Sequence, residues 1–235
     1  MNKTLPTKVL GTAFVAMLSA TANSAIVNVN LIGGVDGSAY GTGAGQILAP
    51  IAYTGTKWNV FSTGTLSNLS DSDGNATGVD VTLSGDTSNG HPTDNPNAYM
   101  RLVDDNRHAG SSDWSMTLSG LTNGQAYDLY LVMAYGSANG GATATMTAGA
   151  DLLPGAAATT GSSSHETAYV EGLNYAVLSF TSNGTDATFA FSDGTFLGRE
   201  PLNAFQLESI PEPSGFLLLL SGTAGLCLVR RRWSN

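Results

Sequence analysis

The sequence predicts an all-β fold: a single antiparallel β-sandwich, preceded by a signal helix and followed by one transmembrane helix. Three observations lead to this prediction. Short runs that alternate apolar and polar residues recur between clusters of turn-forming residues, as half-buried strands do. The segment 26–210 contains no amphipathic helical pattern and is rich in Gly, Ser, Thr and Asn. Each end of the chain carries a separate, mainly apolar stretch.

The alternating runs predict outer strands, each with one apolar and one polar face. In Trp114–Leu118, for example, Trp114, Met116 and Leu118 alternate with serine and threonine. Alternation of this kind is typical of a sandwich strand with one face in the core and the other in water. The same pattern occurs in 27–31, 79–83, 189–191 and 205–207.

The run Tyr127–Tyr135 is apolar on both faces apart from Asp128, which predicts a central strand. Residues 121–125 before it, with Asn-Gly at their centre, predict a hairpin turn. We likewise expect 175–181 to pair with 187–192 across the turn 182–186. Ten or so strands are expected, with longer loops at 33–45, 86–97 and 151–164.

Such a strand count in one domain favours a jelly-roll-like sandwich. Leu121–Tyr135 and Ala204–Ile210 resemble the strands of galactose-binding-like jelly rolls, which are found in many exported bacterial proteins.

The N-terminus has the three parts of a secretory signal peptide. Lys3 and Lys8 precede the apolar stretch Val9–Leu18, and small residues follow up to Ala25. Ala22 and Ala25 are both suitable cleavage positions. We therefore expect residues 1–25 to be a signal peptide and the chain to be exported.

The body, residues 26–210, is strongly acidic. It holds four basic and seventeen acidic residues, which gives a formal charge of −13. Such a surface repels nucleic acid and anionic lipid, so neither is expected as a partner of the body. The only cysteine, Cys227, lies outside the body, which can therefore form no internal disulfide. About 185 residues are enough for one domain with its own core.

Residues 211–235 have the composition of a short membrane anchor. Pro211-Glu212-Pro213 keeps the backbone extended, and the apolar run Phe216–Val229 and three arginines follow it. The fourteen residues of the run span about 21 Å as a helix, which is short against a hydrocarbon core of about 30 Å. The positive-inside rule keeps Arg230, Arg231 and Arg232 cytoplasmic and the body outside.

These residues, in this order, resemble the PEP-CTERM sorting signal of Gram-negative envelope proteins. The resemblance covers about residues 211–232. It implies that an exosortase, an integral-membrane cysteine protease-transpeptidase, recognises Pro211, Glu212 and Pro213 and removes the tail. The inner membrane is then a transient partner, and the mature protein belongs to the envelope or the extracellular matrix. The class is linked to exopolysaccharide and biofilm production.

Candidate binding residues in the body are few. Trp58, next to Lys57 and Asn59, and also Tyr53, are candidates for stacking on a neutral glycan, whereas the register of Trp114 places it in the core. Asp71, Asp73 and Asn75 place oxygens at alternate positions, which calcium could use. A polar turn of the Asx type explains the same spacing and is preferred. No cofactor or resident metal is predicted.

Two classes of function remain for the body. The first is a non-enzymatic surface or exopolysaccharide-associated module. The alternative is an exported glycan-acting hydrolase that uses carboxylates. The first is preferred because the sequence shows no catalytic motif and no metal-binding histidine spacing. Two carboxylates about 5 to 10 Å apart in a cleft would favour the alternative.

Overall fold

A computed structural model describes residues 25–31, 50–51, 57–61, 64–85, 87–90, 106–109, 114–134, 141–150, 157–161, 168–193 and 201–211. These residues form thirteen β-strands and no helix. The predicted all-β class is therefore confirmed for this part of the chain. The expected signal and transmembrane helices, and the loop 33–45, lie outside it.

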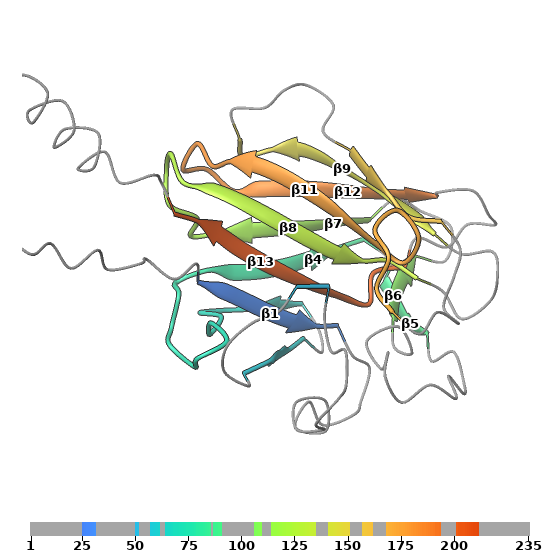
Figure 1. The fold of residues 1–235 in the computed structure, drawn as a ribbon, viewed down its shortest axis with the longest axis horizontal. Helices are drawn as coiled ribbons and strands as arrows, with labels where there is room; N and C mark the ends of the chain where they lie inside the picture. Colours follow the sequence, from blue (N-terminus) through green and yellow to red (C-terminus); the bar gives the residue numbers. More distant parts are fainter. Residues whose placement is uncertain are drawn as a thin grey trace, which may run out of the picture.

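Most of the strands form two sheets that lie face to face (Figure 1). The five-stranded sheet lies in front in Figure 1, and the six-stranded sheet lies behind it. In order, the five-stranded sheet contains β11 (Tyr175–Thr181), β8 (Ala126–Val132), β13 (Ala204–Ile210), β1 (Ile26–Asn30) and β2 (Asn59–Val60). The six-stranded sheet contains β10 (Ala157–Thr159), β9 (Ala142–Ala148), β12 (Ala187–Asp193), β7 (Trp114–Ser119), β4 (Asp80–Ser84) and β3 (Thr65–Leu66).

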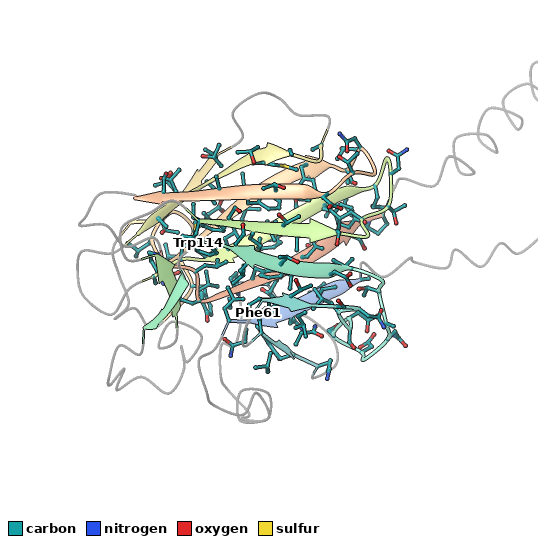
Figure 2. The ribbon with its side chains drawn as sticks, turned by 180° about the vertical axis from the view of Figure 1, so that it is seen from behind. Phe61 and Trp114 are labelled. Atoms are coloured by element: carbon teal, nitrogen blue, oxygen red, sulfur yellow. The ribbon has the colours of Figure 1, made fainter. Side chains whose placement is uncertain are left out.

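Both sheets contribute alternate residues to one hydrophobic core. Along β7 the even-numbered residues are buried and the odd-numbered ones are partly exposed, as the alternation of its sequence predicts. Trp114, labelled in Figure 2, belongs to this core. It stacks on Phe191 of the neighbouring β12 with ring centroids 4.2 Å apart. Phe180 on β11 meets Phe189 on β12 edge-to-face across the two sheets, at 5.7 Å. The predicted β-sandwich is confirmed at this level.

β8 is an interior strand, as predicted, since it pairs with β11 on one side and β13 on the other. The predicted hairpin before it is wrong, because β7 and β8 lie in different sheets. The turn of residues 122–125 is closed by Gln125 N–H donating to Thr122 O, and only Gly124 has a positive φ, of 80°. That is the pattern of a type II turn, whereas the common Asn-Gly hairpin turn needs positive φ at both central residues.

The predicted pairing of residues 175–181 with 187–192 is also wrong. β11 pairs with β8, whereas β12 pairs with β7 and β9 in the other sheet. Residues 182–186 therefore cross between the sheets, held by Ser182 to the turn of residues 122–125 and by Asn183 N–H to Gly149 O. A hairpin within one sheet and a connection between two sheets use the same turn residues, so turn composition could not distinguish them.

Three further differences concern strands. β1 and β2 pair in parallel, so the sandwich is not wholly antiparallel. The expected loops 86–97 and 151–164 contain the strands β5 (Thr87–Gly90) and β10, and β5 pairs with β6 (Asn106–Ala109) in a separate two-stranded sheet. Asn28 and Asn30, expected to face water, are fully buried. Gln206 bonds both the Asn28 side chain and the backbone of Ile51, so a covering segment replaces water there.

Gly149 follows β9 at a close approach to β12. Its φ is +93°, and a Cβ there would lie 2.3 Å from Ala187 Cα and 2.4 Å from Asp186 O. Gly149→Ala should therefore lower the free energy of unfolding by about 2–5 kcal/mol, from left-handed strain and overpacking together.

Gly172→Ala is the matched control, because Gly172 also has positive φ, +77°, but nothing lies within 4 Å of its Cβ position. We expect a cost of only about 1–2 kcal/mol there. Urea titration of both variants measures the difference, and equal losses would contradict the close approach of Gly149 to β12.

The two ends of the described body lie side by side. Ser209 N–H donates to Ala25 O at 3.0 Å, and Ala25 N–H donates to Ser209 Oγ at 3.1 Å. β13 continues to Ile210, and Pro211 after it is exposed. Within the described ranges, no helix is long and apolar enough to cross a membrane. Residues 216–229, the predicted span, are outside those ranges.

Candidate functional site

The outer face of the five-stranded sheet carries a group of tyrosines. Tyr130 on β8 and Tyr175 on β11 alternate with core residues and so point away from the core. Their ring centroids lie 6.4 Å apart, and Tyr169 meets Tyr175 edge-on at 6.3 Å. All three side chains are partly exposed. We refer to Tyr130, Tyr169 and Tyr175 as the tyrosine face.

Two carboxylates border the tyrosine face. Asp128 on β8 and Glu208 on β13 are direct cross-strand partners, and Glu208 Oε2 accepts a hydrogen bond from the Tyr130 hydroxyl at 3.4 Å. Burial raises the pKa of Tyr130 to about 12, with the nearby charges of Glu208 and Asp128 acting in the same direction. Burial, then the charge of Glu171, also raises the pKa of Tyr175. Both phenols are therefore protonated and can donate hydrogen bonds at neutral pH.

The chemistry of this surface suits a neutral, polyhydroxylated ligand. Aromatic rings offer apolar surface with a polar tip, so they can pack against the C–H face of a sugar ring. The carboxylates accept hydrogen bonds from hydroxyl groups, and charge-assisted bonds of this kind are the stronger ones. The same negative charges disfavour an anionic ligand.

The two carboxylates also bear on the hydrolase alternative. Direct cross-strand partners have Cβ atoms about 4.5–5.5 Å apart, and retaining glycosidases hold their carboxyl groups about 5–5.5 Å apart. Asp128 and Glu208, however, are partly exposed on the outer face of the five-stranded sheet and do not line the cavity described next. A cleft with two converging carboxylates is not seen among the described residues.

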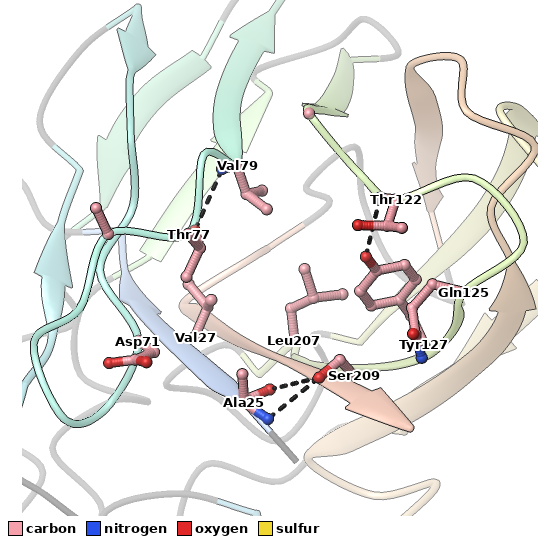
Figure 3. A pocket seen from close by; sticks show the side chains of 12 residues that line it. Ala25, Val27, Asp71, Thr77, Val79, Thr122, Gln125, Tyr127, Leu207 and Ser209 are labelled. Atoms are coloured by element: carbon pink, nitrogen blue, oxygen red, sulfur yellow. Dashed lines mark hydrogen bonds between the residues drawn. The ribbon is translucent and has the colours of Figure 1, made fainter. Parts of the chain in front are cut away.

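A cavity of about 300 Å³ opens between the sheets at the end where Ala25 and Ser209 meet (Figure 3). Core side chains form its apolar lining, and polar residues from two turns and from β13 surround them. Most of these polar groups are already bonded within the protein: Thr122 N–H donates to the Tyr127 hydroxyl at 3.1 Å, and Thr77 Oγ1 donates to Leu69 O at 2.7 Å. The described lining residues are Ala25, Val27, Asp71, Ala76, Thr77, Val79, Gly120, Thr122, Gln125, Tyr127, Leu207 and Ser209.

Asp71, for which the sequence offers calcium binding as the alternative to a preferred Asx-type turn, stands at the edge of this cavity and organises its own turn. Its Oδ1 accepts the backbone N–H groups of Asp73 and Asn75, and its Oδ2 accepts Asn75 Nδ2 at 3.0 Å. Burial raises the pKa of Asp71, but the hydrogen bonds from Asn75, Asp73 and Gly74 outweigh it and lower the pKa below its ordinary value. The predicted Asx-type turn thus explains the spacing. Among described residues no group of three His, Cys, Asp or Glu side chains could hold a metal.

The predicted glycan platform at Trp58 is corrected by the structure. Trp58 is only 6% exposed and packs with Val132, Ala134 and Ala204. These four residues form a second apolar cluster, and Tyr169 and Tyr175 pack against it. The Trp58 ring is therefore too buried to stack on a glycan. Tyr53 lies outside the described residues, as do Glu212, Pro213 and the three arginines of the tail. Only Pro211 of the predicted sorting motif is described.

Sequence reasoning missed the tyrosine face and its carboxylates. The alternation within 127–135 does place Asp128 and Tyr130 on the same face. The position of Glu208 beside Asp128 follows from the pairing of β13 with β8, which are more than seventy residues apart. That pairing leaves no local signal in the sequence.

Comparison with known proteins does not assign a class to this chain. No protein-family model matches it, and no curated protein matches it either.

Proposed function

We propose that this chain is an exported envelope protein sorted by a PEP-CTERM-like tail. The leader 1–25, the acidic body and the tail 211–235 support the proposal. Strand β1 begins at Ile26 and strand β13 ends at Ile210, so the folded body fills the interval between the two signals. The partner is an exosortase-type membrane transpeptidase, with the inner membrane as a transient anchor.

The intact mass of the wild-type protein from the cell envelope tests the sorting proposal. We expect a chain that has lost both the signal peptide and the tail, so that Phe216–Asn235 are absent. A mature protein that retains Phe216–Asn235 would replace this proposal with a plain tail anchor.

We propose further that the body is a non-catalytic, jelly-roll-like module that associates with a neutral glycan such as exopolysaccharide. The observation that carries this is the tyrosine face with its bordering carboxylates. The jelly-roll-like topology is supported by the first and last strands of the body, β1 and β13, being neighbours in one sheet. This surface takes the place of Trp58 in the glycan hypothesis.

Tyr130→Ala should weaken binding of the mature protein to a neutral glycan by about 5- to 150-fold. This corresponds to about 1–3 kcal/mol, by analogy with bases stacking on aromatic side chains. Tyr130→Phe is the matched control, because it keeps the ring and loses only the hydroxyl bond to Glu208. Calorimetric titration with glycans chosen from an array screen gives the affinities. Unchanged affinity in Tyr130→Ala would exclude this surface.

The hydrolase alternative is retained because Asp128 and Glu208 are direct cross-strand partners. It predicts that the purified protein releases reducing sugar from the bound glycan and that Glu208→Gln abolishes the release. The non-catalytic proposal predicts no release from either protein.

A further inference from the structure

The last strand of the body remains paired with a neighbouring strand up to the residue before the sorting motif. β13 pairs with β8 as far as Ile210 opposite Ala126, and β1 pairs with its other side. Ser209 extends the second pairing through its bonds with Ala25. Pro211, the next residue, is exposed and has no N–H to continue a ladder. The folded body therefore ends at Ile210 without a spacer.

One side chain holds this last residue in place. Gln125 Nε2 donates to Ile210 O and also to Ala126 O, so it joins the end of β13 to the start of β8. The backbone of Gln125 is itself fixed, since its N–H donates to Thr122 O and its carbonyl accepts Ser182 N–H at 3.0 Å. The half-buried Gln125 side chain therefore extends from a turn that directly precedes β8 and is hydrogen-bonded to Ser182, the residue after β11.

This attachment limits what a processing enzyme can reach. Residues 211–215, fully extended, span at most about 17 Å between the body and the apolar run. An enzyme that binds its substrate as an extended strand needs free backbone N–H and C=O groups. Those of β13 are shared with strands on both sides, so binding N-terminal to Pro211 requires the strand end to detach.

We propose that Gln125 is a positioning residue for tail processing: by holding Ile210 it sets where the accessible substrate begins and limits the processing rate. The proposal rests on the sorting function proposed above. It assigns to the body a part in its own maturation that is independent of any glycan.

The first test compares processing rates of full-length chains in cells that contain an exosortase. Gln125→Ala should raise the rate constant about two- to tenfold, because loss of one ordinary hydrogen bond shifts the opening of the strand end by that factor. Thr122→Ala is the matched control: it lies in the same turn, and its hydrogen bonds are made by its backbone N–H and carbonyl, which the substitution keeps. It should process at the wild-type rate. Pulse–chase labelling with mass detection of the two forms gives the rates.

A second variant separates positioning from general destabilisation. Insertion of Gly-Ser-Gly between Ile210 and Pro211 leaves every side chain of the body in place and should accelerate processing similarly. In the Gln125→Ala background the same insertion should add little, because both changes relieve one constraint. Hydrogen exchange of the full chain should be faster in the peptide that covers 205–211 of Gln125→Ala, with Tm little changed.

The outcomes distinguish the two proposals. A wild-type chain that keeps its tail overturns the sorting function and this inference with it. A wild-type chain that is processed, with neither Gln125→Ala nor the insertion changing the rate, overturns this inference alone. Additive effects of the two changes would likewise show that Gln125 does not act through access to the strand end.

Discussion

Glu212→Ala should leave the chain in the membrane with its tail attached. The change removes the only charge of Pro211-Glu212-Pro213 and leaves the apolar run and the arginines as they were, so insertion is unaffected. Loss of a hydrogen bond to a charged group costs about 1.5–3 kcal/mol. A loss of this size in the binding of Glu212 by the enzyme lowers the processing rate about 10- to 150-fold. The intact mass of the envelope protein, followed over time, measures it.

Glu171→Ala is the matched control, because it removes one exposed carboxylate from the body at a distance from the tail in the sequence. It should mature at the wild-type rate. Normal maturation of Glu212→Ala would show that Glu212 is not part of the recognised motif.

Changing all three tail arginines should act at an earlier step. Arg230, Arg231 and Arg232 are the only basic residues after the apolar run, and they orient the segment. Their joint replacement by alanine should disturb retention and topology before any cut, which protease accessibility of the body in spheroplasts would detect. Correct topology in that variant would contradict their orienting role.

Trp114→Ala should lower the free energy of unfolding of the body by about 3–5 kcal/mol, the usual cost of truncating a buried aromatic residue. Trp114 is 2% exposed and stacks on Phe191 with only 8° between the ring planes. Since domains are stable by about 5–15 kcal/mol, the loss is a large fraction of the total. Urea titration followed by circular dichroism measures it.

Val170→Ala provides the comparison, since Val170 is 44% exposed and a surface change of this kind costs about 0.5 kcal/mol or less. A similar loss in both variants would contradict the packing of Trp114 between the sheets.

The strands themselves were predictable from local pattern. Trp114, Met116 and Leu118 alternate with polar residues and all three are buried, and Phe189 and Phe191 face the same core. A period of two residues identifies a half-buried strand wherever one face is covered. β1 is the exception, because a covering segment also buries its polar face.

The neighbours of each strand could not be predicted in the same way. Asn123-Gly124 and Asn183-Gly184 have hairpin composition, yet each belongs to a connection that crosses between sheets. Trp58 stands among polar residues in the sequence, yet it is covered by Tyr169 and Tyr175. In each case the outcome depends on contacts between residues that are distant in the chain.

The sequence by itself determined the all-β class, the acidic body and the candidate signals at both ends, because these depend on composition, periodicity and order along the chain. Only the tertiary structure decided that Asp128 meets Glu208 beside Tyr130, and that Gln125 holds Ile210. The physical reason is that cross-strand pairing is fixed by the packing of two whole sheets. No short stretch of residues carries enough free energy to specify its partner alone.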